Sequence, residues 1–109
     1  MGGERIYVTG IGAVSAAGND VDGIVGALKS GKTFLRPASR FETALQMPVG
    51  EVGLSDDELR TLLGVDVNVI SRTSLLGLKA VREAVDDHLR RTGGAVPKRG
   101  VFMSGTSVG

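Results

Sequence analysis

The longest helical pattern in the sequence runs from Asn68 to Arg91, and it limits the folds open to the chain. Apolar residues recur along one face of this segment: Val69, Ile70, Thr73, Leu76, Leu78, Ala80, Val81, Val85 and Leu89. Charged residues lie mostly on the opposite face: Arg82, Glu83, Asp86, Asp87, Arg90 and Arg91. Gly93 and Gly94 end the pattern. A helix of this kind buries its apolar face against another layer of secondary structure.

Segments typical of buried strands stand near both ends of the chain. Ile6–Thr9 is β-rich and ends at Gly10, and Gly100–Ser104 runs into a second glycine-rich loop. Between Gly10 and Gly18 the residues are nearly all small, which predicts a tightly packed loop after the first strand. The chain has 17 glycines, a number that suits several short strand-to-loop transitions.

Two shorter helices and one short strand are expected between these segments. Asn19 and Asp20 are suited to cap a helix over 21–29, with Val21, Ile24, Val25 and Leu28 on its apolar face and Gly31 at its end. The Ser-x-x-Glu capping box at 55–58 opens a helix that runs to Leu63. The range 47–52 is consistent with an edge strand. This order of elements predicts an α/β layered domain with partly parallel strands.

Composition excludes several classes of function. The chain has 109 residues, enough for one domain, with 41% hydrophobic and 23% charged residues and a net charge of +1. We expect no nucleic-acid partner, because the chain lacks a basic excess and has 4% aromatic residues. It has no cysteine, which removes thiolate and cysteine-zinc chemistry. No apolar stretch approaches the roughly 18 residues of a membrane helix, and the first residues lack a secretory signal, so the expectation is a cytoplasmic protein.

Of two phosphate-binding patterns, the first matches this sequence in full but in the wrong structural context, and the second fails in the sequence itself. Gly26, Gly31, Lys32 and Thr33 match G-x-x-x-x-G-K-T, but a helix is expected before the loop, where the mechanism needs a strand. The dinucleotide pattern G-x-G-x-x-G fails at Ser15. The hypothesis that this chain is an independent nucleotide-binding domain depends on the first match alone.

The chain offers no set of residues for nucleophilic or metal chemistry. His88 is its only histidine, and its place late in the long helix predicts a solvated side chain near the helix C-terminus. Ser15, Ser104 and Ser107 lie among glycines but do not form the G-x-S-x-G pattern of hydrolases. We therefore expect no catalytic residue, cofactor or metal ligand in this chain.

Three segments in this order resemble one enzyme family. RIYVTGIGAVSAAGN, SRTSLLGLKAVREAV and GVFMSGTSVG are similar to the start of an elongating β-ketoacyl-acyl carrier protein synthase, a type II ketosynthase with the thiolase fold. The resemblance extends from Arg5 to Gly109. Val25 and Phe34 depart from it, since many relatives carry Trp and Gly there. Both departures concern packing.

The resemblance implies a fold, an activity and partners. Residues 1–109 would be one N-terminal segment of a thiolase-like layered αβαβα domain, incomplete in this chain and without a second domain. The complete protein would be an acyltransferase for decarboxylative Claisen condensation in fatty-acid or polyketide synthesis, working on acyl carrier protein as a homodimer or a ketosynthase-like heterodimer. The family's catalytic cysteine and two histidines come later, and His88 matches neither histidine. Thr106, Ser107 and Val108 would belong to the acyl-pocket loop. The alternative is a non-catalytic partner of the chain-length-factor type.

Overall fold

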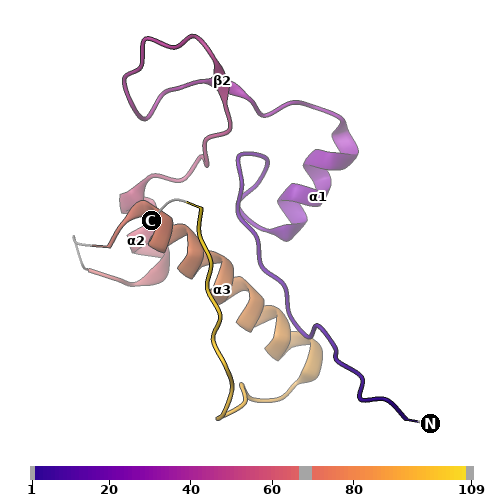
Figure 1. Cartoon of the computed structure of the whole chain (residues 1–109). Helices are drawn as coiled ribbons and strands as arrows, with labels where there is room; N and C mark the ends of the chain where they lie inside the picture. The colour runs from indigo at the N-terminus through magenta and orange to yellow at the C-terminus, as the bar shows by residue number, and fades with distance from the viewer. Residues whose placement is uncertain (1, 67–69, 108–109) are drawn as a thin grey trace.

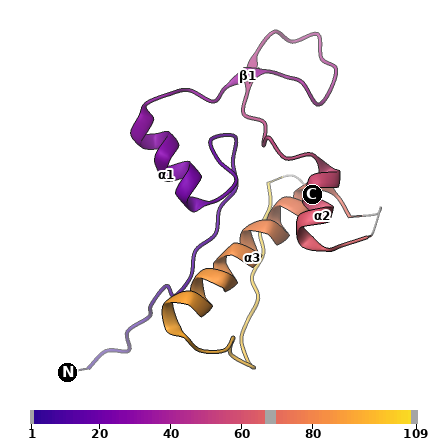
Figure 2. The same cartoon turned by 180° about the vertical axis from the view of Figure 1, so that it is seen from behind.

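The computed structural model describes residues 2–66 and 70–107, which form an open, elongated arrangement of three helices and a short strand pair (Figure 1). The elements in chain order are α1 (Val21–Ser30), β1 (Arg36–Pro37), β2 (Pro48–Val49), α2 (Asp56–Leu63) and α3 (Arg72–Thr92). Helix α3 is the longest element, and both α2 and the N-terminal part of the chain lie along it (Figures 1 and 2).

Local capping signals fix the helix ends. Asp20 accepts a hydrogen bond from the Gly23 amide at 2.7 Å and begins α1. The predicted capping box is confirmed, because Ser55 Oγ accepts from the Glu58 amide and Glu58 Oε2 accepts from the Ser55 amide. Each helix ends on a glycine in the left-handed region, with φ between 62° and 67°, where a side chain would add strain.

Helix α3 starts later than the sequence predicts. Its N-cap is Ser71, whose hydroxyl accepts from the Ser74 amide at 3.2 Å, and its first helical residue is Arg72. The prediction placed the start at Asn68, which lies outside the described residues together with Val69. The predicted end is confirmed to within one residue, since Gly93 caps the helix after Thr92.

The core of the described residues lies between α2 and the first turns of α3. Leu59 and Leu75 are fully buried, Leu63 is 8% exposed, and partly buried apolar residues surround them: Leu54, Val65, Ile70 and Leu76. The predicted apolar face of α3 omitted Leu75 and included Leu78, which is 43% exposed. The reason is that α2 is only eight residues long and covers one end of α3.

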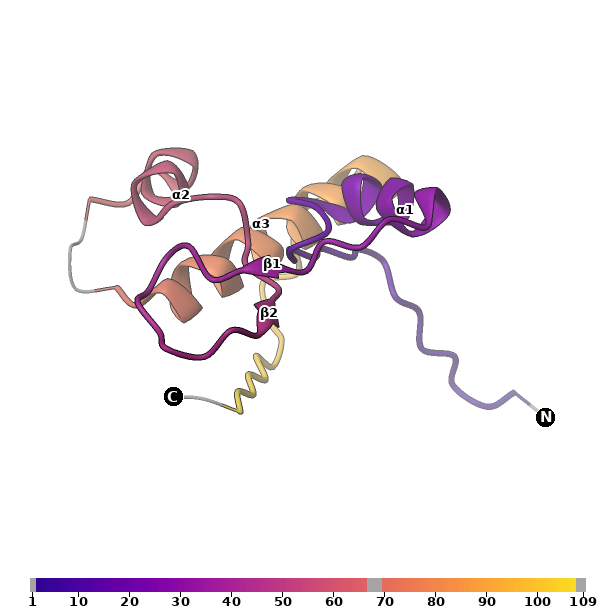
Figure 3. The same cartoon turned by 90° about the horizontal axis from the view of Figure 1, so that it is seen from above.

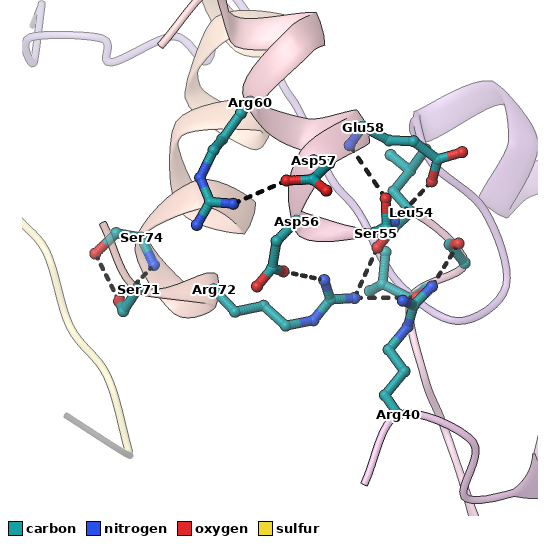
Figure 4. Close-up of polar contacts among 12 residues, drawn as sticks. Arg40, Leu54, Ser55, Asp56, Asp57, Glu58, Arg60, Ser71, Arg72 and Ser74 are labelled. Atoms are coloured by element: carbon teal, nitrogen blue, oxygen red, sulfur yellow. Dashed lines mark hydrogen bonds and ion pairs between the residues drawn. The ribbon is translucent and has the colours of Figure 1, made fainter. Parts of the chain in front are cut away.

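One arginine joins the start of α3 to the chain before α2 (Figure 4). Arg72 Nη1 donates to Asp56 Oδ1 at 2.6 Å, and Nη2 donates to the carbonyl oxygens of Val52 and Leu54 at 3.1 and 2.9 Å. The two terminal nitrogens of the planar guanidinium thus donate to three acceptors, one carboxylate oxygen and two carbonyl oxygens. It therefore fixes α3 relative to the segment that leads into α2.

The strand content differs from the prediction. The expected edge strand over 47–52 is present only at Pro48–Val49, which pairs antiparallel with Arg36–Pro37. Ile6–Thr9 and Gly100–Ser104 are not strands in the part of the chain that the structure describes. Neither has a neighbouring strand to supply hydrogen-bond partners, and a strand exists only within such a pair.

Candidate functional site

Hydrogen bonds join Thr9–Ala13 to the second half of α3, across separations of 70 to 79 residues in the sequence. We call Thr9–Ala13 the glycine strap. The Ile11 amide donates to Asp87 Oδ2 at 3.1 Å, and the Ala13 amide donates to Glu83 Oε2 at 2.9 Å. The strap thus runs antiparallel to α3, as Figures 1 and 2 both show.

The spacing of the two carboxylates matches the spacing of the two amides. Glu83 and Asp87 are four residues apart, which is about 6 Å along a helix axis. Ile11 and Ala13 are two residues apart, about 6.6 Å along an extended chain. Alternate amides of an extended strap can therefore meet successive turns of one helix face. This match explains how side chains of α3 replace a strand as the hydrogen-bond partner of the strap.

Glycines at alternate strap positions allow the close approach. A Cβ added to Gly12 would overlap the Ala80 carbonyl oxygen and lie 2.8 Å from the Ala84 nitrogen. A Cβ added to Gly10 would overlap the Ala84 carbonyl oxygen. The strap backbone thus packs directly against the backbone of α3. The sequence prediction of a tightly packed small-residue loop is confirmed for these positions.

The same helix face also holds the start of α1. Glu83 Oε1 accepts from the Val21 amide at 2.8 Å, so one carboxylate joins the strap and α1 to α3. Lys79 Nζ donates to the Asn19 carbonyl oxygen. A cavity of about 440 Å³ lies beside these groups, with Ile11, Glu83 and Asp87 in its wall. Because Glu83 already accepts from two backbone amides, the arrangement serves to position the chain.

Asp87 is the buried charge of the site. It is 6% exposed and accepts from Arg90 and Arg91 as well as from the Ile11 amide. The hydrogen bonds from Arg91, Ile11 and Arg90, in that order of size, lower the pKa of Asp87 from 3.8 to about 2. The sequence pattern placed Asp87 on the solvent face of the helix, and this prediction is wrong. The strap covers Asp87, and a helical pattern alone contains no information about the strap.

Replacing Asp87 with Asn should change how stability depends on pH. Because the pKa of Asp87 is lowered on folding, the carboxylate contributes stability that is fully present above its unfolded pKa near 3.8 and is lost as the pH falls towards 2. We expect Asp87→Asn to lower the urea midpoint at pH 7, and the difference from the wild type to shrink between pH 4 and pH 2. Urea unfolding followed by circular dichroism measures this difference. A constant difference across that range would contradict the assignment.

His88 lies at the end of the strap. Its Nδ1 is 2.8 Å from Thr9 Oγ1, and its Nε2 is 3.5 Å from the Ala95 carbonyl oxygen. The predicted solvated histidine is instead half-buried between two segments of the chain. A neutral ring that donates from Nε2 to the carbonyl leaves Nδ1 to accept from the threonine hydroxyl.

The loop between β1 and β2 is held at its base. Glu51 accepts from the Ser39 hydroxyl at 2.6 Å and from the amides of Ser39 and Arg40, and these bonds, the hydroxyl first, lower the pKa of Glu51. Arg40 donates to the carbonyl oxygens of Val52 and Gly53. The loop borders a cavity of about 860 Å³, which is lined by residues 37–43 and 45–48.

The acyl-pocket loop implied by the family resemblance is only partly described. Thr106 and Ser107 are exposed near the end of the described chain, and Val108 lies outside the described residues. The glycine strap, which the sequence did not single out as a site, is the better-defined feature. Its available sequence signal is the pair Gly10 and Gly12 together with acidic residues four apart on the long helix.

The P-loop match has the wrong scaffold. Gly26 lies inside α1, and Gly31 is its C-cap, so Lys32 and Thr33 follow the carbonyl end of a helix. Phosphate sites use the amide end of a helix that follows the loop. The structure thus confirms the sequence prediction that a helix precedes the loop. The matching residues therefore lack the helix N-terminus after the loop that would bind phosphate.

Residues 2–66 and 70–107 contain no group of three or more metal-ligating side chains, and none of their helices has the length and apolar character of a membrane span. Comparison with protein-family models, curated proteins and solved structures finds no match to this chain.

Proposed function

We propose that this chain is the N-terminal portion of a ketosynthase with a thiolase-like layered fold. The observation that carries the proposal is the order and spacing of the three resembling segments, at 5–19, 71–85 and 100–109. The glycine strap supports it, because the first of these segments packs against the second through Gly10 and Gly12. Contact between two of the resembling segments supports a shared fold more strongly than their order in the sequence does alone.

The complete protein would condense acyl groups without a metal or an organic cofactor of its own. A cysteine would accept the acyl group from acyl carrier protein, whose phosphopantetheine arm carries it. Malonyl-carrier protein would then lose CO2, and its carbanion would attack the thioester to give the β-ketoacyl product and release the cysteine. Two histidines and backbone amides would stabilise the developing charges. All of these groups would come from the remainder of the ketosynthase, in the cytoplasm.

Residues 1–109 would supply scaffold and pocket. The role of the glycine strap would be to hold the first segment against α3, while Thr106, Ser107 and Val108 would line the acyl pocket near a dimer interface. The second candidate is a chain-length-factor-type partner that shapes the pocket without chemistry. The same three segments favour it equally, because the position of the nucleophile is not among these residues.

One experiment separates these two functions. The complete protein that contains this chain is incubated with acyl-loaded carrier protein, and its intact mass is measured. A mass increase equal to one acyl group, removed by hydroxylamine, supports a ketosynthase. Absence of acylation, combined with a changed product length when a ketosynthase partner is added, supports the chain-length-factor type. Absence of both effects overturns the proposal.

A bulky residue at position 108 should reduce the use of long acyl chains. Val108→Phe adds several carbon atoms to the proposed pocket wall, and overpacking typically costs ~1–3 kcal/mol. We expect acylation by long primers to fall roughly ten-fold or more, because ~1.4 kcal/mol corresponds to ten-fold. Short primers should be little affected. The measurement is the acylation rate against primer length, and a uniform loss at all lengths would identify Val108 as a packing residue only.

A further inference from the structure

Positive charge is concentrated in the part of the chain that runs from α1 to β2. Residues 23–50 have a net charge of +3, from one acidic residue, Glu42, and four basic residues: Lys29, Lys32, Arg36 and Arg40. Since the whole chain has 13 basic and 12 acidic residues, the remainder has nine basic and eleven acidic residues, a net charge of −2. The near-neutral chain is therefore divided into a basic part and an acidic part. We call residues 28–47 the basic arm.

The basic arm lies apart from the core between α2 and α3. Figures 1 and 2 show it along one edge of the molecule, and Figure 3 shows it crossing the molecule from α1 through β1 to the loop at 38–47. Lys29, Lys32 and Arg36 are exposed, and their charged groups have no hydrogen-bond or ion-pair partner among the described residues. Arg40 instead donates to two carbonyl oxygens at the base of the loop. Three cations of the arm are thus available to a ligand.

The loop of the basic arm also exposes large apolar side chains. Phe41, Leu45 and Met47 are each more than half exposed. The loop is fixed at its base, because Glu51 accepts hydrogen bonds from the amide and the hydroxyl of Ser39 and the strands on either side of the loop pair with one another. The apolar side chains are therefore presented on a projecting loop of defined shape, next to the unpaired cations.

This combination of charge and apolar exposure fits the surface of a bilayer that contains anionic lipids. Such a surface attracts Lys and Arg side chains, and apolar side chains enter the boundary between the headgroups and the acyl chains. An acidic protein would also attract the cations, but it would cover the apolar side chains only with a surface of complementary shape. A bilayer accepts a projecting apolar loop without that requirement. The arm therefore favours a lipid surface.

We propose that the basic arm binds the surface of membranes that contain anionic lipids. Its three unpaired cations would lie at the headgroups, and the apolar side chains of its loop would enter the boundary with the acyl chains. This contact is peripheral, and it differs from a membrane-spanning helix, which the described residues lack. The inference rests on the arm itself and does not depend on the proposed function.

Vesicle binding by the complete protein that contains this chain tests the charged half of the proposal. Vesicles of equal parts phosphatidylserine and phosphatidylcholine should bind the protein, and vesicles of phosphatidylcholine alone should not. Added salt should weaken the binding, because it screens exposed charges. Lys32→Glu with Arg36→Glu should weaken it at least about ten-fold, since one cation near such a surface contributes about five-fold. The matched control, Lys98→Glu with Arg99→Glu, reverses two exposed charges outside the arm and should leave binding nearly unchanged.

The apolar half is tested by removing one leucine from the loop. Leu45→Ser should weaken binding to the anionic vesicles several-fold, because less apolar surface leaves water. Its control, Leu62→Ser, makes the same change at an exposed leucine of α2 and should have little effect. Circular dichroism shows whether each variant keeps its helices. Lys32→Gln with Arg36→Gln replaces the charge-reversal variant if that variant does not fold.

Four results would overturn the proposal: no binding to the anionic vesicles, equal binding to both kinds of vesicle, equal losses in the charge-reversal variant and its control, and unchanged binding in Leu45→Ser. Binding of the unsubstituted protein to poly-glutamate but to neither kind of vesicle would also overturn it, and would identify acidic polypeptides as the ligand of the arm. The acylation experiment tests the proposed function separately, so that failure of one proposal leaves the other standing.

Discussion

Truncating Leu59 to Ala is expected to lower the free energy of unfolding by about 2–5 kcal/mol. Leu59 is fully buried and packs with Leu63 and Leu75 in the core between α2 and α3. The truncation removes apolar contact and leaves a cavity that Leu63, Leu75 and their neighbours cannot refill. Domains are typically stable by about 5–15 kcal/mol, so this loss is a large share of the total.

The control for this prediction lies on the same helix. Leu62 is 55% exposed, and Leu62→Ala makes the same chemical change without creating a cavity. Urea unfolding followed by circular dichroism should show a large midpoint shift for Leu59→Ala and a small one for Leu62→Ala. Equal shifts would mean that helix propensity, and not the packing of α2 on α3, determines the stability of this unit.

The helix ends of this protein are predictable from its sequence, because the signals that determine them are local. Asp20, Ser55 and Glu58 act within three residues of their partners, and the glycines that end α1 and α3 need only their own backbone conformation. The structure agrees with the prediction at these positions. Such features need no knowledge of the rest of the fold.

Burial depends on partners distant in sequence, and there the predictions were less accurate. In α1 the expected apolar face contained Val25 and Leu28, yet Ala27 is the buried residue, and Leu28 is 75% exposed. Asp87 looked solvated because the residues that cover it lie 76 positions earlier in the chain. A helical pattern shows which face is apolar, but it does not show where a short helix or a strap will lie.

The candidate site could be predicted only in part for the same reason. The loop at 105–109 was selected by resemblance, and its role stays a prediction. The glycine strap was expected to pack tightly, but its partner was not identified. The carboxylates of Glu83 and Asp87 hold the strap. They can be recognised as its partners only when their spacing of about 6 Å along the helix is compared with the spacing of alternate residues in an extended chain.

Adding a single methyl group to the glycine strap should detach it from α3. In Gly12→Ala the new Cβ would overlap the Ala80 carbonyl oxygen and lie 2.8 Å from the Ala84 nitrogen, and both are helix backbone atoms that cannot move aside. Overpacking of this kind costs about 1–3 kcal/mol. The strap can escape the overlap only by leaving the helix, and then the amides of Ile11 and Ala13 lose their carboxylate partners.

The effect of Gly12→Ala should be local to the strap and the start of α1. Gly53→Ala is the matched control, because a Cβ there meets nothing within 4 Å and Gly53 has no positive φ. Amide exchange at 11, 13 and 21 should accelerate in Gly12→Ala and remain unchanged in Gly53→Ala, since the Val21 amide depends on the same Glu83 carboxylate. Exchange in the core around Leu59 and Leu75 should be nearly unaffected, because α2 and not the strap covers that end of α3. Unchanged exchange at 11 and 13 in Gly12→Ala would mean that the strap does not pack on α3 in solution.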